Sequence, residues 1–170
     1  MHRMRKVLAA VLSAPLALVP VPVPAGTTNG SLAVSATVVS SCVVSGATLN
    51  FGSAIDPTSA SVPIDASTTM TVQCTATTPY SVALNAGLNA GSTSNFAGRA
   101  MKSGANTLGY QLYVDTLRAV VWGDGTSLSG VLPGVGTGSN QTLTIFGRLP
   151  SLTGAVPGTY NDTVTVTVTY

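Results

Sequence analysis

The sequence has few of the general bases and metal ligands that enzymes commonly use. It has no glutamate, its single histidine is His2, and 7% of its residues are charged. Histidine and the carboxylates supply most general bases, and histidine is the commonest metal ligand. We therefore predict that the protein is not an enzyme and has no catalytic residues, no metal site and no cofactor. The remaining alternative is a site built by two of the five aspartates, which are Asp56, Asp65, Asp115, Asp124 and Asp162.

Residues that cover a solvent-exposed helix are also scarce. Apolar residues make up 45% of the chain, and serine, threonine, asparagine and glycine dominate the rest. A helix of this composition would lack the Glu, Lys and Arg of a polar helical face, so we expect an all-β protein. Its low charge leaves strand edges open to pairing with other chains, which favours a protein made for assembly.

The first apolar run is too short to cross a membrane. It covers residues 7–19 and follows a basic stretch at residues 3–6. This order is typical of a secretory signal peptide, and Val23 and Ala25 provide small residues for its cleavage. We predict a signal peptide over residues 1–25 and no membrane insertion after its removal.

Removal of the signal peptide changes the sign of the charge. The full chain has seven basic and five acidic residues, and three of the basic ones lie in the signal peptide. The secreted part therefore has four basic residues (7 − 3) against five acidic ones, a net charge of about −1. The positive charge of the full chain thus gives no reason to expect a nucleic-acid partner.

Two cysteines, Cys42 and Cys74, are an even number in an exported chain, where oxidation is expected. Each lies on the apolar side of its own predicted strand. We predict a buried disulfide, which stabilises the domain by roughly 3 to 4 kcal/mol if it acts by restricting the unfolded chain. Two thiols without a histidine nearby suit neither a zinc site nor a catalytic cysteine.

Short alternating segments separated by turn residues fill most of the secreted part. Alternation of apolar and polar residues is the pattern of half-buried strands, and about seven strands at this spacing predict a sandwich. No helical crossover of adequate length joins them, so we expect antiparallel pairing within one domain. The glycine-rich stretch at residues 130–140 is expected to be a mobile connection. The alternating segments are residues 47–51, 67–75, 80–84, 98–103, 107–115, 141–149 and 164–170.

Both ends of the secreted part carry strand-like sequence. Four apolar residues occupy alternate positions before the first cysteine, and three valines and a tyrosine do the same at the other end. Most domains fray into polar ends, so two such segments indicate a chain that pairs with other chains. The residues are Leu32, Val34, Ala36 and Val38 at the first end and Val164, Val166, Val168 and Tyr170 at the second.

The single tryptophan, Trp122, stands beside a Gly-Asp-Gly turn. A lone tryptophan after a strand commonly covers the end of a sandwich core, but an exposed ring also stacks on sugars. The sequence leaves both interpretations open, as core residue or as ligand-binding aromatic.

Three stretches occur in a fixed order in the second half of the chain. They are YQLYVDTLRAVVWGDGTSLSG from Tyr110, IFGRLP from Ile145, and PGTYNDTVTVTVTY up to Tyr170. With the early cysteine after an alternating segment, they closely resemble the spore coat protein U domain family, which includes the subunits of archaic, Csu-type chaperone-usher pili. The resemblance covers residues 31–170.

The resemblance implies an immunoglobulin-like antiparallel sandwich that lacks its final strand. In this family a periplasmic chaperone lends a strand to the incomplete domain, and at the outer-membrane usher the N-terminal extension of the next subunit replaces it. Carried onto this sequence, residues 26–40 would be the extension and residues 41–170 the domain. The donor side chains would be Leu32, Val34, Ala36 and Val38, and the acceptor groove and chaperone contact would include Val164, Val166, Val168 and Tyr170.

The function that the resemblance implies is that of a structural subunit of a secreted surface fibre, a pilus. Identical or related subunits would join head to tail, pass through the periplasm and reach the cell surface, where the fibre would serve adhesion or biofilm formation. The alternative is a secreted spore-coat or carbohydrate-binding adhesin module that uses the sandwich as a scaffold and binds sugar through Trp122.

Overall fold

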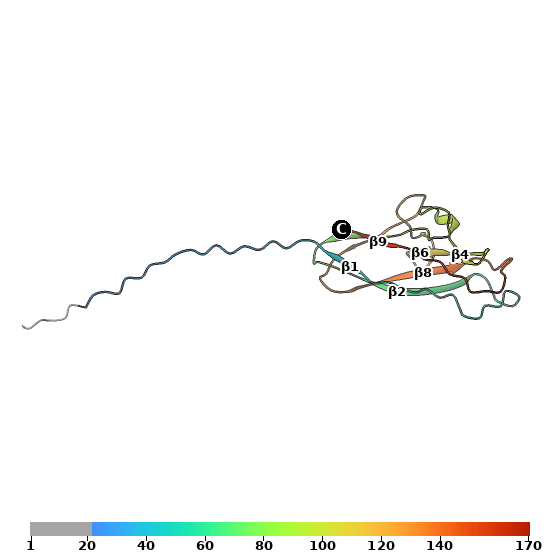
Figure 1. Ribbon diagram of the computed structural model, residues 1–170, viewed down its shortest axis with the longest axis horizontal. Helices are drawn as coiled ribbons and strands as arrows, with labels where there is room; N and C mark the ends of the chain where they lie inside the picture. Colours follow the sequence, from blue (N-terminus) through green and yellow to red (C-terminus); the bar gives the residue numbers. More distant parts are fainter. Residues whose placement is uncertain (1–21) are drawn as a thin grey trace, which may run out of the picture. The chain divides into compact units, whose positions relative to one another are not determined.

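The computed structural model describes residues 22–170 (Figure 1). Residues 1–21, which hold most of the predicted signal peptide, lie outside the described residues. Within the described part, no helix has the length and apolar character needed to cross a membrane. The chain divides into two units, one ending at Thr37 and the other running from Val38 to Tyr170.

Residues 22–37, the described part of the first unit, form neither helix nor strand. Leu32 and Val34 are 87% and 85% exposed. Alternation predicts a strand here, but a strand forms only where a second strand supplies backbone partners. The segment therefore has the sequence pattern of a strand without being one.

The regular secondary structure of the second unit is almost entirely β-strand. They are β1 (Cys42–Val44), β2 (Ile64–Cys74), β3 (Pro79–Leu84), β4 (Ala100–Ser103), β5 (Asn106–Gly109), β6 (Gln111–Tyr113), β7 (Leu132–Val135), β8 (Gln141–Leu149) and β9 (Val166–Thr169), with one 3₁₀ turn, η1 (Phe96–Gly98). A four-stranded sheet has the order β1-β2-β8-β6, a three-stranded sheet has the order β7-β3-β9, and β4 pairs with β5. All pairs are antiparallel, which confirms the predicted fold class.

The alternate residues of both larger sheets meet in one hydrophobic core. Met70 and Val72 of β2, Val82 and Leu84 of β3, and Leu149 of β8 are each at most 1% exposed. Burial of such an aliphatic side chain contributes roughly 1.5 to 3 kcal/mol to folding. The core is therefore built by the same alternation that predicted these three strands.

Three predicted segments differ from the structure. The stretch at residues 130–140 is not merely a mobile connection, because it contains β7, which pairs with β3. Gly134 of β7 lies against the ring of Tyr80, where a side chain would collide, so this glycine permits a strand to approach an aromatic ring. Residues 47–51 form no strand, and β9 begins at Val166, two residues later than predicted.

Candidate functional site: the groove beside the last strand

The strand β9 has a free edge. Among the described residues, it pairs with β3 alone. Just before β9, the amide of Asn85 donates to the carbonyl oxygen of Thr165 at 3.0 Å. Successive residues of a strand direct their backbone groups to opposite sides. Thr165 therefore faces the β3 side, while Val164, Val166 and Val168 direct their N–H and C=O groups to the free edge.

A groove reaches the start of this free edge and runs along the residues before it. Two adjoining hollows of about 390 and 660 Å³ are lined on one side by residues between 46 and 57 and on the other by residues between 155 and 166. Both hollows are lined by Leu49, Phe51 and Tyr160, so they form one continuous groove. Core side chains from both sheets and from the β4–β5 pair line it as well, namely Leu84, Met101, Leu108, Leu112 and Ile145.

Residues 46–51 form the first wall of the groove. They follow β1 directly, and the amide of Ser45, just before them, donates to the carbonyl oxygen of Thr71 at 2.9 Å. Leu49 and Phe51 pack over Gly147 of β8, where an added Cβ would collide with both side chains. This wall is held by side-chain packing rather than by strand pairing.

Asp162 fixes the second wall just before β9. Its Oδ1 accepts hydrogen bonds from the amide of Leu88 at 3.0 Å and the side chain of Asn89 at 2.9 Å. Its Oδ2 accepts one from the hydroxyl of Tyr110 at 2.7 Å. Burial, together with the hydrogen bond to Asp162, raises the pKa of Tyr110 above its ordinary value, so the hydroxyl stays protonated and remains a donor.

A buried arginine supports the same region. Arg99 is 2% exposed, and its guanidinium donates to the carbonyl oxygens of Asn85 at 2.7 Å and Trp122 at 2.8 Å and to Oε1 of Gln111 at 2.8 Å. Burial lowers the pKa of Arg99 to about 10, so the side chain stays charged at neutral pH. The sequence analysis missed both Arg99 and the anchoring role of Asp162, because their partners are distant in the chain and no motif signals them.

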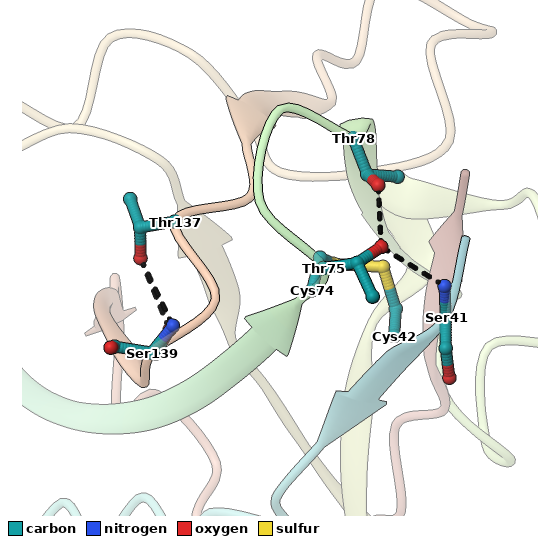
Figure 2. Close-up of a disulfide and its surroundings, with 7 residues drawn as sticks. All are labelled: Ser41, Cys42, Cys74, Thr75, Thr78, Thr137 and Ser139. Carbon is teal, nitrogen blue, oxygen red and sulfur yellow. Dashed lines mark hydrogen bonds between the residues drawn. A yellow bond between two sulfur atoms is a disulfide. The ribbon is translucent and has the colours of Figure 1, made fainter. Parts of the chain in front are cut away.

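The predicted disulfide between Cys42 and Cys74 is present (Figure 2). The two residues are directly opposite each other in the β1–β2 pair. Cys74 is buried, whereas Cys42 is half-buried because β1 lies at the edge of its sheet. Beside them, the amide of Ser41 donates to the hydroxyl of Thr75 at 3.2 Å (Figure 2). The disulfide thus fixes the point at which the N-terminal segment enters the domain.

Trp122 lies in the core. It is 0% exposed, and its indole N–H donates to the carbonyl oxygen of Val82 at 2.9 Å. Of the two interpretations of Trp122, the structure selects the core residue, because a fully buried ring offers no face to a sugar. Within residues 22–170, no cluster of three or more His, Cys, Asp or Glu residues is arranged to hold a metal ion.

The predicted acceptor residues lie at different depths. Val164 and Val166 line the groove, Val168 is half-buried, and Tyr170 is 57% exposed. The predicted donor side chains are all exposed, and they are Leu32, Val34, Ala36 and Val38. The donor and acceptor roles of these two sets stay predictions.

The antiparallel sheets and the free edge of β9 define the class of this protein as an all-β, immunoglobulin-like sandwich. Residues 28–167 match the Spore Coat Protein U domain family, and the chain belongs to that family. The predicted resemblance is therefore confirmed. The family and the fold are those of structural subunits rather than of enzymes.

The chain is similar to a protein of known sequence and to a solved structure. Protein U of Myxococcus xanthus is 35% identical over 182 residues, an alignment that covers 100% of both chains. The fold is also similar to that of a chain in the crystal structure of a chaperone–tip adhesion subunit pre-assembly complex from the archaic chaperone-usher Csu pili of Acinetobacter baumannii. That similarity has a TM-score of 0.58 and 26% sequence identity over 79% of this chain. It spans 40% of the length of the matched chain.

Proposed function

We propose that this protein is a structural subunit of a secreted surface fibre in which each copy donates a strand to the next. The free edge of β9 beside an apolar groove carries this proposal. Unpaired backbone groups beside a groove lined by apolar side chains are the features that an added strand satisfies. The occupant that we assign to the groove is the segment at residues 26–40 of another copy.

The donor segment and the free edge match in length and pattern. Leu32 to Val38 and Val164 to Tyr170 each span six residue steps (38 − 32 and 170 − 164). At about 3.3 Å per residue, each stretch is about 20 Å long when extended. Four apolar side chains at alternate positions of the donor therefore meet four edge residues that also alternate.

The energy of this contact favours a stable link. Burial of three or four aliphatic side chains contributes roughly 1.5 to 3 kcal/mol each, before the loss of freedom of the donor segment is counted. The new backbone ladder satisfies N–H and C=O groups along the β9 edge. Such a contact joins two different surfaces of the same protein, so it repeats head to tail and builds a filament.

A subunit with an open groove needs protection before assembly, because an exposed strand edge invites aggregation. We propose a periplasmic chaperone as the partner that fills the groove first and an outer-membrane usher as the site of exchange. The chaperone complex of the similar Csu pilus structure supports this proposal. The fibre would reach the cell surface and serve adhesion or biofilm formation.

The match to the Spore Coat Protein U domain family favours a second setting, a secreted spore coat. In a coat module the sandwich is a scaffold, and copies need no strand exchange. The two proposals therefore differ in whether residues 29–39 are required for linkage. A sugar-binding module would need another site, because Trp122 is buried.

The test replaces one side chain of the donor segment and compares filaments by electron microscopy. Cells express the full chain together with its chaperone and usher. Val34→Asp places a charge among the alternate apolar side chains that would enter the groove. It should abolish filaments, because burial of an unpaired carboxylate is strongly unfavourable. Ser35→Asp is the matched control, because Ser35 would face away from the groove, and it should leave the filaments intact. Filaments of normal length from Val34→Asp, or from a chain lacking residues 29–39, would contradict the proposed function.

A further inference from the structure

We propose that the Cys42–Cys74 disulfide shields the first groove wall from tension that arrives through the N-terminal segment. The inference rests on the proposed function, because only a linked fibre pulls on that segment. In such a fibre each subunit is held at two places, by its own donor segment and by the strand seated in its groove. Tension therefore crosses the domain from Ser41 to the groove.

The position of the disulfide decides which residues lie on that path. The bond joins Cys42 to Cys74, so residues 43–73 lie inside a closed covalent loop. This loop contains the wall at residues 46–51, whose Leu49 and Phe51 line the groove. A pull on Ser41 passes directly across the disulfide to Cys74 and bypasses the wall.

Without the disulfide, the same pull would reach the wall through a weak strand. β1 has three residues and lies at the edge of its sheet. After β1, two hydrogen bonds hold Ser45 to Thr71. The Ser45 amide donates to the Thr71 carbonyl oxygen at 2.9 Å, and the Thr71 amide donates to the Ser45 hydroxyl at 2.8 Å. Edge bonds pulled from one end break one after another, and Leu49 and Phe51 would follow β1 out of place.

With the disulfide, tension continues toward the acceptor strand. Cys74 leads through a four-residue turn into β3, which pairs with β9. The turn is closed by a contact of 2.6 Å between the hydroxyls of Thr75 and Thr78 (Figure 2), and the Thr78 amide also donates to the Thr75 carbonyl oxygen at 3.2 Å. The amide of Gly136 donates to the carbonyl oxygen of Thr78 at 2.7 Å, which ties the turn to the segment after β7.

A disulfide that served only general stability would predict a different response. Its reduction would loosen the groove by the same factor whatever the point of attachment. The shielding role predicts an effect that depends on where the domain is pulled, because only a pull on the N-terminal segment acts on β1 first.

The experiment measures how long a groove-bound peptide survives under constant force. The mature chain carries Val34→Asp to prevent self-linkage, and a synthetic peptide of residues 29–39 is bound in its groove and attached to a bead. The chain is tethered either at its N-terminus or at a handle inserted beside Gly125, an exposed turn residue outside the groove lining. The assembled complex is compared before and after reduction, so no variant has to fold without its disulfide.

Reduction should shorten the peptide lifetime at least about tenfold under N-terminal tension, the factor expected from loss of one buried aliphatic wall contact. The chain should also lengthen by about 40 Å before release. The 22 residue steps (64 − 42) from Cys42 to Ile64 extend to about 75 Å, whereas in the folded domain Cys42 lies opposite Cys74 and is already about 33 Å from Ile64, the length of β2. Under tension through Gly125 the lifetime should change less than twofold. Equal lifetimes before and after reduction under N-terminal tension, or equal shortening in both geometries, would overturn the inference. Failure of the peptide to bind without force would instead overturn the proposed function and, with it, the inference.

Discussion

Tyr110 and Asp162, which both line the groove, are joined by a hydrogen bond of 2.7 Å from the tyrosine hydroxyl to the carboxylate Oδ2. Asp162 stands just before β9, and Tyr110 lies between β5 and β6. The bond therefore fixes the start of the free edge to the core of the sandwich. In the proposed assembly, an edge held in this way is already shaped before the donor strand arrives, which lowers the loss of freedom on binding.

Replacement of Asp162 by asparagine should loosen this edge. An amide has one acceptor oxygen, so it cannot accept the hydrogen bonds of Tyr110, Leu88 and Asn89 as the carboxylate does. We expect a loss of about 1 to 3 kcal/mol in the free energy of unfolding, measured by urea denaturation. Asp124→Asn, in an exposed turn, is the matched control and should change stability by less than about 0.5 kcal/mol. Equal losses from both variants would contradict the anchoring role.

Gly147→Ala should displace the first groove wall. A Cβ at this position collides with Leu49 and Phe51, and overpacking of this kind typically costs about 1 to 3 kcal/mol. Because Leu49 and Phe51 line the groove, the affinity for a peptide of residues 29–39, measured by calorimetry, should fall when they are displaced. Gly109→Ala provides a control at another strand glycine, because its nearest neighbour would be the Arg99 carbonyl oxygen at 3.8 Å. Unchanged affinity in Gly147→Ala would show that Leu49 and Phe51 do not contribute to the groove.

Trp122→Ala should act on stability rather than on recognition. The change empties a fully buried site and removes the partner of the Val82 carbonyl oxygen, with an expected loss of about 3 to 5 kcal/mol. Circular dichroism is the suitable measurement, because Trp122 is the only tryptophan. A variant of normal stability that had lost binding to a sugar would contradict the core role.

Asp65 should make stability fall at acid pH. Its hydrogen bond with Arg148, at 2.7 Å, and the charge of Arg118 lower the pKa of Asp65 below its ordinary value of 3.8. A lowered pKa in the folded state means that the stabilisation is present above about pH 4 and is lost as the pH falls through the folded value. Asp65→Asn should remove this part of the pH dependence between pH 2 and 5, measured by thermal unfolding, and Arg148→Met should reduce it. An unchanged profile in Asp65→Asn would contradict the assignment.

The strands that sequence alternation predicted well are those with a partner on both sides. β2 and β8 pair along nine positions, from Ile64 with Leu149 to Val72 with Gln141. The alternation of apolar and polar residues predicts both strands. Residues 47–51 alternate equally well but form no strand, because alternation reports burial and not pairing. The sequence therefore predicts which residues face the core more accurately than it predicts which residues form backbone hydrogen bonds between strands.

The interior of the site depended on contacts that the sequence does not reveal. The hydroxyl of Tyr110 and the carboxylate of Asp162 come from positions 52 residues apart, and each alone resembles an ordinary core or turn residue. The glycine-rich sequence of residues 130–140 predicts a mobile connection rather than β7, yet Gly134 is needed beside the Tyr80 ring. The family motifs supplied the idea of an acceptor edge, and the structure supplied the groove and its two walls.

Hydrogen exchange at the β9 edge is the most direct measurement of the central claim. The mature chain carrying Val34→Asp is compared by NMR with and without an excess of the peptide of residues 29–39. The amides of Val164, Val166 and Val168 should exchange at least about tenfold more slowly with the peptide bound, while those of Thr165 and Thr167 should change little because they already face β3. If exchange of the three valine amides is not slowed, or if the two threonine amides are slowed equally, donation of a strand to this edge is contradicted.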